Sequence, residues 1–134
     1  MSFLTAESPE FTLEIKRSEF ICRIKHVETE DQAKDFIAER KKLHSLATHN
    51  CYAYVIGRNA GIMRYSDDGE PGGTAGLPIM EVIKAQGVVN CIVVVTRYFG
   101  GVLLGAGGLV RAYTQGCAVA LKAAQVVVME HSQR

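Results

Sequence analysis

The sequence predicts one α+β domain, a two-layer arrangement in which a mixed β-sheet carries helices mainly on one face. Three observations support this class. Strand and helix patterns follow the order ββαββαβα over 134 residues, and 48% of the residues are hydrophobic, which suffices for one substantial core. The run from Cys91 to Val95 is apolar throughout, as expected of a central strand covered on both faces. We expect a short extension over 1–10, the domain over 11–125 and a polar tail over 126–134.

The first two elements are predicted to form a β-hairpin. From Phe11 to Lys16, apolar and polar residues alternate with the period of two that a half-buried strand requires. After a polar break at 17–19, the same alternation resumes from Phe20 to Lys25. The second run is therefore the expected partner of the first.

A helix is predicted next. Thr29 and Gln32 fit a capping box, in which the two side chains satisfy backbone N–H groups at a helix start. Apolar residues then recur at helical spacing from Ala33 to Leu43, and three basic residues near the end complement the helix dipole. We expect this helix to end near His44.

The middle of the chain predicts a second hairpin and a short helix. Cys51 to Ile56 and Ile62 to Tyr65 are rich in aromatic and β-branched residues and are separated by a polar turn. The helix is expected from about Leu77 to Gln86, because Pro78 suits a first helical turn and Gly87 suits a helix end.

The last elements are the central strand and a long helix from Leu109 to Ala124. Small residues along one face of this helix would permit close packing on a sheet. The residues on that stripe are Leu109, Ala112, Tyr113, Gly116, Cys117, Ala120 and Leu121.

Composition narrows the function classes. A formal net charge of +1 excludes a strongly basic grip on nucleic acid over the whole surface, although local patches remain open. The four cysteines contain no CxxC pair, so we expect reduced thiols, three of them in apolar surroundings, and no cofactor. Neither a transmembrane run nor a secretory signal is apparent, which predicts a cytoplasmic protein without membrane contact.

A glycine-rich loop from Thr96 to Gly108 has the layout of an anion-binding site. It runs into the N-terminus of a predicted helix, where free N–H groups and the helix dipole favour negative charge. Alternatively, its glycines only supply positive φ angles and its aromatic residues pack in the core. The loop has no Walker lysine and no GxGxxG fingerprint at a first strand. The candidate ligand-binding residues are Arg97, Tyr98, Phe99, Gly100, Gly101, Gly105, Gly107, Gly108 and Arg111.

A second loop, from Ser66 to Gly76, is acidic. Its carboxylates and hydroxyls are ligands that hard cations such as Mg²⁺ prefer, but they do not have the EF-hand spacing. Pairing of these carboxylates with Arg97 or Arg111 is the favoured interpretation, since it would hold the two loops together, and no metal is assigned. The candidates for a loop partner or a metal ligand are Asp67, Asp68, Glu70 and Gly72.

The tripeptide His49-Asn50-Cys51 contains the chemical groups of a cysteine hydrolase. Adjacent residues of a strand point to opposite faces, so the three cannot form a triad by themselves. Catalysis by Cys51 is disfavoured, and no catalytic residue is assigned.

Three motifs resemble the IMPACT/YigZ family: HNCYAY from His49, SDDGEPGGTAGLPIMEVI from Ser66 and VVVTRYFGGVLLGAGGLVRAY from Val93. The resemblance covers about Phe11 to Leu121. It implies the fold of the second domain of small-subunit ribosomal protein five, shared with the fourth domain of elongation factor G and with galactokinase-type kinases. Bacterial members usually add a ferredoxin-like domain after this one, and eukaryotic members usually precede it with a protein-binding domain.

The resemblance also implies a role near translation. We expect a non-catalytic regulatory module that binds RNA, a ribosome or a translation-related partner through the two glycine-rich loops. The alternative is an enzyme that acts on a phosphorylated or anionic small molecule, with metal assistance as an option. A third hypothesis makes the loops a protein-docking face, for which exposure of Tyr98 or Phe99 would be the sign. The oligomeric state is left open.

Overall fold

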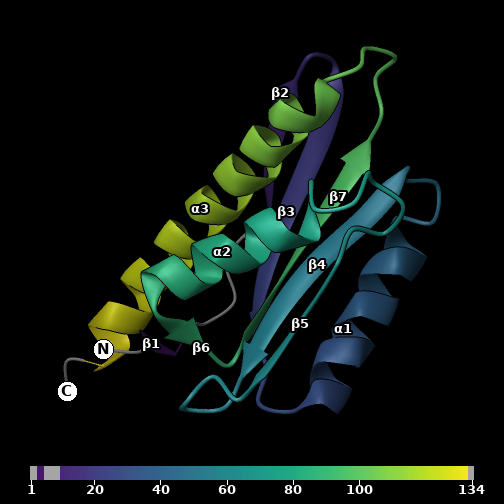
Figure 1. Cartoon of the computed structure of the whole chain (residues 1–134). Coiled ribbons are helices and arrows are strands. Elements are labelled where there is room, and N and C mark those ends of the chain that lie inside the picture. The colour runs from purple at the N-terminus through teal and green to yellow at the C-terminus, as the bar shows by residue number, and fades with distance from the viewer. Residues whose placement is uncertain (1–2, 5–9, 133–134) are drawn as a thin grey trace.

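A computed structural model describes the backbone of residues 3–4 and 10–132 and the side chains of residues 10–124. Its main feature is a five-stranded sheet with the strand order β2-β3-β7-β4-β5, in which every neighbouring pair is antiparallel (Figure 1). The strands are β2 (Phe11–Ile15), β3 (Ser18–His26), β4 (His49–Ile56), β5 (Ile62–Ser66) and β7 (Cys91–Tyr98).

Three helices cover this sheet: α1 (Glu30–Leu43), α2 (Gly76–Gln86) and α3 (Gly105–Ser132). Helices α2 and α3 lie side by side on one face, and α1 lies on the other (Figure 1). The α+β class is confirmed, and two of the three helices lie on one face as expected. Two details were wrong: α1 covers the other face, so the arrangement has three layers instead of two, and the main sheet is antiparallel instead of mixed. A parallel pair occurs only in a separate two-stranded sheet of the described residues, between β1 (Phe3–Leu4) and β6 (Val88–Val89).

Two apolar clusters fill the space on either side of the sheet. Val93 and Val95 of β7 belong to the larger cluster, which contains buried residues of α2 and α3. Ile92 and Val94 belong to the smaller cluster with residues of α1 such as Phe36. Because successive side chains of a strand point to opposite faces, the uninterrupted apolar run at β7 is buried on both, as predicted.

The predicted helix ends are observed, but the Gln32 side chain bonds to a different backbone N–H group from the one that the capping box predicts. The Thr29 hydroxyl accepts a hydrogen bond from the backbone N–H of Gln32 at 3.1 Å. The Gln32 side chain accepts one from the N–H of Glu28 at 2.8 Å, one residue before the position that a standard capping box uses. At the end of α2, Gly87 adopts φ +69°, a conformation in which glycine is not strained.

The glycine-rich loop between β7 and α3 is shorter than the sequence predicts. Strand β7 continues through Tyr98, and α3 begins at Gly105, so the predicted loop from Thr96 to Gly108 shrinks to residues 99–104. Thr96 continues the strand because its hydroxyl donates to Asn50 Oδ1 at 2.6 Å, which satisfies a buried polar group. Gly105, Gly107 and Gly108 are therefore in the first turn of a helix.

The apolar stripe predicted for the last helix is buried, from Leu109 to Leu121. The helix runs on to Ser132, into the segment expected to be a tail, and β1 lies in the segment expected to be an extension. The domain limits at 11 and 125 stay predictions. All four cysteines are free and buried. No helix among the described residues is long and apolar enough to cross a membrane.

Candidate functional site

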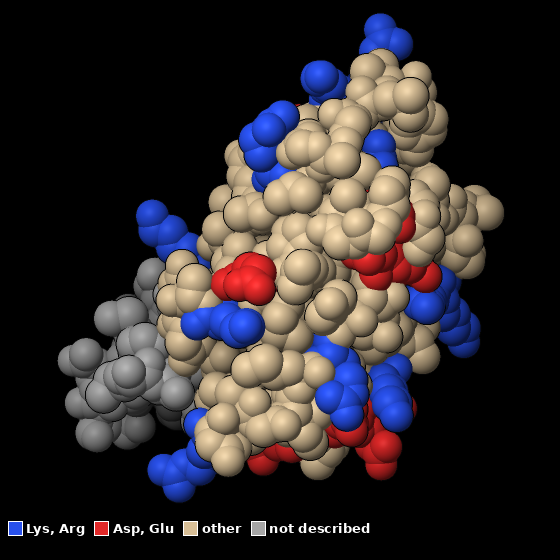
Figure 2. All heavy atoms as spheres, viewed as in Figure 1, with Lys and Arg blue, Asp and Glu red and all other residues tan. Residues whose placement is uncertain are grey.

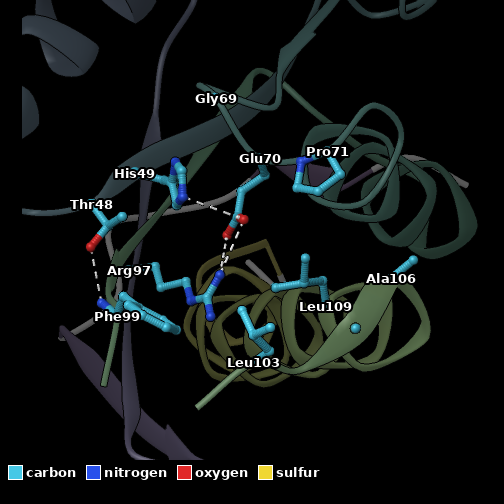
Figure 3. Close-up of a pocket in the computed structure, with 11 residues that line it drawn as sticks. Thr48, His49, Gly69, Glu70, Pro71, Arg97, Phe99, Leu103, Ala106 and Leu109 are labelled. Atoms are coloured by element: carbon cyan, nitrogen blue, oxygen red, sulfur yellow. Dashed lines mark hydrogen bonds and ion pairs between the residues drawn. The ribbon is translucent and has the colours of Figure 1, made fainter. Parts of the chain in front are cut away.

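A pocket opens where the start of β4, the loop 67–75, the end of β7 and the start of α3 meet. Its volume of about 380 Å³ lies near the lower end of the range typical of ligand sites. Figure 3 shows His49, Glu70 and Arg97 grouped together, with Leu103 and Leu109 on the α3 side. The pocket thus combines charged groups from three segments with an apolar wall.

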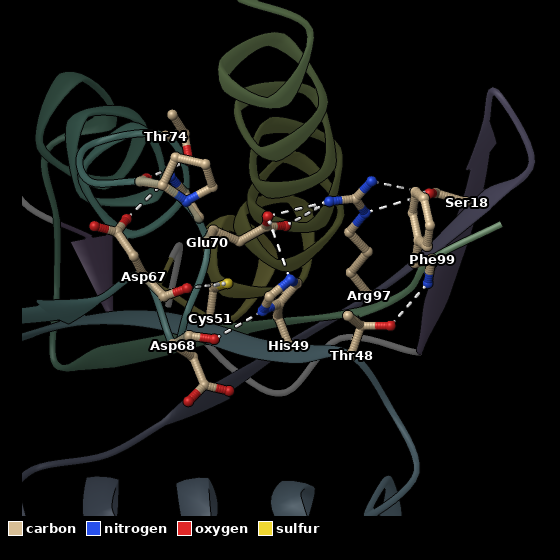
Figure 4. A network of polar contacts seen from close by, with 12 residues as sticks. Ser18, Thr48, His49, Cys51, Asp67, Asp68, Glu70, Thr74, Arg97 and Phe99 are labelled. Carbon is tan, nitrogen blue, oxygen red and sulfur yellow. Dashed lines mark hydrogen bonds and ion pairs between the residues drawn. The ribbon is translucent and has the colours of Figure 1, made fainter. Parts of the chain in front are cut away.

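A buried ion pair lies beneath this pocket. The Arg97 Nη1 group donates to both carboxylate oxygens of Glu70, at 3.1 and 2.9 Å. Glu70 is 6% exposed and Arg97 is 5% exposed. The buried hydroxyl of Tyr113 donates to Glu70 Oε2 at 2.6 Å. Ser18 Oγ accepts from Arg97 Nε and Nη2 at 3.2 Å (Figure 4). Of the carboxylates expected to pair with Arg97 or Arg111, Glu70 does so.

Aromatic rings cover both the ion pair and its surroundings. The guanidinium of Arg97 lies 5.5 Å from the ring centre of Phe20 and 5.4 Å from that of Phe99. Phe20 also contacts the Tyr113 ring edge-on at 5.3 Å. A guanidinium over an aromatic face is attracted by the ring quadrupole, more strongly when it is desolvated. The ion pair is therefore both hydrogen-bonded and shielded from water.

Asp67 holds the loop that leads into α2. Its carboxylate accepts hydrogen bonds from the backbone N–H groups of Gly73, Ala75 and Gly76, at 3.0, 3.1 and 2.8 Å. These contacts satisfy N–H groups at the start of α2, where the cap residue Ala75 makes no side-chain hydrogen bond. The carboxylate of Asp67 thus stabilises the fold and does not reach Arg97 or Arg111.

Asp68 has a similar role at the edge of β4. Its carboxylate accepts from the N–H of Asn50 at 2.6 Å and lies 3.8 Å from the Lys41 amine. Gly72 is exposed in the same loop. No group of three or more His, Cys, Asp or Glu among the described residues has the arrangement of a metal site. A metal role for these residues has no geometric support in this part of the chain.

His49 ties the start of β4 to the loop 67–75, a role that sequence reasoning missed. Its Nδ1 lies 2.8 Å from the carbonyl oxygen of Asp68, and since a carbonyl can only accept, Nδ1 carries a proton. Its Nε2 lies 3.4 Å from Glu70 Oε1, a contact that becomes an ion pair when the imidazole is protonated. The two-residue period of β4, which directs His49 and Cys51 to the same face, was the available signal.

The Cys51 thiol is a structural group. It is fully buried and lies 3.1 Å from the carbonyl oxygen of Asp67 and 3.4 Å from the hydroxyl of Tyr113. Burial, followed by the nearby Glu70 carboxylate, raises the pKa of the Cys51 thiol above its usual range. Because the thiolate is the nucleophile, a neutral buried thiol does not support the cysteine-hydrolase alternative.

The rim of the pocket is apolar and exposed. Residues 99–104, which we call the docking loop, extend beyond the end of β7, to about the level of the turn between β2 and β3 (Figure 1). In this loop Phe99 is 44% exposed, Val102 38% and Leu103 82%. The backbone N–H of Phe99 donates to Thr48 Oγ1 at 3.0 Å, which ties the base of the loop to the start of β4. The tip carries its apolar side chains into solvent.

The other predicted ligand-binding residues are dispersed, apart from Gly105, which lines the pocket. Tyr98 faces the α1 side, where its hydroxyl lies 2.7 Å from His44 Nδ1, so it does not line the pocket. Arg111 is exposed on the second turn of α3. Gly101 and Gly105 have φ angles of +91° and +76°, a region that favours glycine. Ligand contact by these residues stays a prediction.

These features define a small α+β domain in which an exposed loop lies over a buried ion pair at the junction of two helices and a sheet. The chain belongs to the Impact N-terminal domain family, whose model matches residues 16–121. The resemblance seen in the sequence motifs is thereby confirmed.

Relatives support the family and the fold. The IMPACT family member YvyE of Bacillus subtilis is 53% identical over 111 residues, covering 83% of this chain and 51% of the relative. A crystal structure of a hypothetical protein is 40% identical with a TM-score of 0.85, covering 90% of this chain and 59% of that one. A structure described as the two-domain translational regulator Yih1 is 26% identical with a TM-score of 0.53, covering 89% and 45%. The chain spans about half the length of these relatives.

Proposed function

We propose that this chain is a non-catalytic regulatory module that docks a translation-related partner through the docking loop. The observation that carries the proposal is the 82% exposure of Leu103, beside the half-exposed Phe99, at the mouth of the pocket. Protein-binding surfaces are built around clustered apolar anchors. A single exposed apolar residue is normal on any protein surface, but Leu103 and Phe99 lie together at the pocket mouth. The description of Yih1 as a translational regulator supports the kind of partner.

The charged groups of the pocket support binding over catalysis. A general acid or base must reach the substrate within hydrogen-bond distance. Glu70 and Arg97 are buried and use their polar atoms on one another, on Ser18 and on Tyr113. The enzyme alternative would require His49 to act without a free carboxylate or thiol among the described residues that line the pocket.

Co-sedimentation with ribosomes tests the proposal. Purified ribosomes from Bacillus subtilis, the source of the relative at 53% identity, are centrifuged through a sucrose cushion with the chain at several salt concentrations. We expect the chain in the pellet and Leu103→Gln in the supernatant. Leu43→Gln is the matched control, because Leu43 is 63% exposed on α1 and lies outside the pocket.

Two results would contradict this proposal. One is absence of the chain from the pellet at the lowest salt concentration, and the other is equal pelleting of Leu103→Gln. Pelleting that falls steeply with salt and does not depend on Leu103 would indicate contact with the RNA backbone.

A further inference from the structure

The docking loop is surrounded by positive charge. Lys16 and Arg17, both exposed, form the turn between β2 and β3. This turn packs against the loop so closely that a methyl group on Gly100 would overlap the Arg17 carbonyl. On the other side of the loop, a methyl group on Gly107 would lie 3.4 Å from Nη1 of the exposed Arg111. Figure 2 shows chiefly blue side chains around this end of the molecule.

The acidic residues near the mouth of the pocket either lie beside a basic residue or are on the opposite face of the sheet. Asp68 lies near Lys41, and Glu70 is buried against Arg97. Glu19 pairs in register with Tyr98, and its side chain is on the α1 face of the sheet. From residue 82 to residue 129 the sequence contains no Asp or Glu. Lys16, Arg17 and Arg111 make no ion pair with any described residue.

The side chains at the loop tip favour a peptide over a nucleic acid. Stacking of bases needs free aromatic faces, and the Phe99 ring has one of its two faces over the Arg97 guanidinium. The most exposed large apolar side chain of the docking loop is Leu103, and Pro71, Ala106 and Leu109 continue the apolar wall into the pocket. Such a wall accepts an apolar side chain, and the surrounding cations complement acidic residues beside it.

We infer that the pocket takes an apolar side chain from a partner peptide whose flanking residues are acidic. This inference rests on the proposed docking function and names the chemistry of the partner segment. The apolar anchor lies between Leu103 and Pro71, and the acidic flanks lie against Arg17 and Arg111.

Selection from a phage-displayed library of random dodecamer peptides tests the inference on the immobilised full chain. We expect enriched peptides to carry an apolar residue with Asp or Glu on both sides, and Leu103→Gln to abolish the enrichment. A synthetic copy of an enriched peptide is then titrated by fluorescence anisotropy. Arg17→Glu and Arg111→Glu should each weaken its binding about tenfold, while Leu43→Gln should leave the binding unchanged.

A charge-swapped peptide, with Lys in place of each Asp or Glu, shows whether a variant binds weakly because an electrostatic contact is lost or because the variant is misfolded. It should bind Arg111→Glu more tightly than the unaltered chain, and equal thermal melting curves show that each variant is folded. Enrichment of neutral or basic peptides, absence of enrichment, or preferential binding of a uridine dodecamer at this surface would overturn the inference. If Leu103-dependent pelleting with ribosomes persists in that case, the proposed docking function stands and only the partner chemistry is wrong.

Discussion

The buried and exposed ends of the candidate site differ in what their contacts accomplish. At the buried end, Glu70, Arg97 and Tyr113 are joined by short hydrogen bonds and have almost no exposed surface. At the exposed end, Leu103 and Val102 carry apolar surface into solvent. The charged residues, which look like the chemistry of the site in the sequence, stabilise the fold. The apolar residues of the loop are the ones that we propose for recognition of a partner.

Phe99 belongs to both ends. Its N–H group is bonded to Thr48, and its ring covers the Arg97 guanidinium while remaining 44% exposed. A partner that contacts the exposed part of this ring would therefore contact a side chain that also packs on the buried Arg97. Phe99 therefore links the buried ion pair directly to the surface that we propose for docking.

The largest effect is expected from Glu70→Gln. This variant leaves the buried Arg97 without its counter-charge, which should lower the free energy of unfolding by about 3–5 kcal/mol. Urea denaturation followed by circular dichroism measures the change, with the exposed Glu81→Gln as control. Combining Glu70→Gln with Arg97→Gln should recover part of the loss, because no buried charge remains. A loss no larger than that of Glu81→Gln would show that the buried end does not stabilise the fold.

The thiols should be unreactive at neutral pH and destabilising at alkaline pH. Burial raises the pKa of the Cys22 thiol to about 12, so its thiolate fraction at pH 8 should be on the order of a thousandfold below that of an exposed thiol. Its contribution to stability is present below the ordinary thiol pKa of about 9 and is lost as the pH rises toward 12.

Alkylation by iodoacetamide, followed by mass spectrometry, measures the reactivity of each thiol in the folded chain and in urea. Melting temperatures from pH 7 to pH 11 measure the loss of stability. Rapid modification of Cys51 in the folded chain would contradict its assignment as a structural group and reopen the enzyme alternative.

A smaller loss of stability is expected from alanine substitutions at two neighbouring glycines of the docking loop, and its size should differ between them. In Gly100→Ala the new methyl group would overlap the backbone carbonyl of Arg17, which should cost about 3 kcal/mol of stability, the upper end of the usual range for overpacking. In Gly101→Ala no atom lies within 4 Å of the methyl group, so only the positive φ of +91° opposes it, at about 1–2 kcal/mol. Urea denaturation of both variants measures the difference. An equal loss for the two would mean that the loop moves away from the turn.

The smallest effect on stability is expected from Leu103→Gln. An exposed side chain that packs little should change the free energy of unfolding by less than about 0.5 kcal/mol, even though ribosome pelleting is lost. The same urea titration measures this value, and Leu43→Gln gives the comparison. A loss above 1.5 kcal/mol would place Leu103 among the packed residues and remove the contrast between the two ends.

Local patterns predicted most of the fold because each element has its own period. The alternation in β2 and β3, the Thr29 cap and the stripe on α3 depend on residues a few positions apart. The errors lie where a long-range contact overrides the local signal. Thr96 and Arg97 end the apolar run in the sequence, but they remain in β7 because Asn50 and Glu70 satisfy their polar groups.

The site shows the same division. The pairing of an acidic residue of one loop with Arg97 was predictable from charge and from the absence of competing acids. Ser18 and Tyr113 were not, because one lies next to a hairpin turn and the other on the apolar stripe of a helix. Only their positions in the folded chain bring them within 3.2 Å and 2.6 Å of the ion pair.

The sequence by itself determined the α+β class, the order of the main elements and the two loops that meet at the pocket, since periodicity and turn chemistry are local properties. Only the tertiary structure decided which charged side chains form buried ion pairs and which apolar side chains remain exposed. Burial depends on contacts between residues as far apart as Ser18 and Arg97, and no local pattern encodes it.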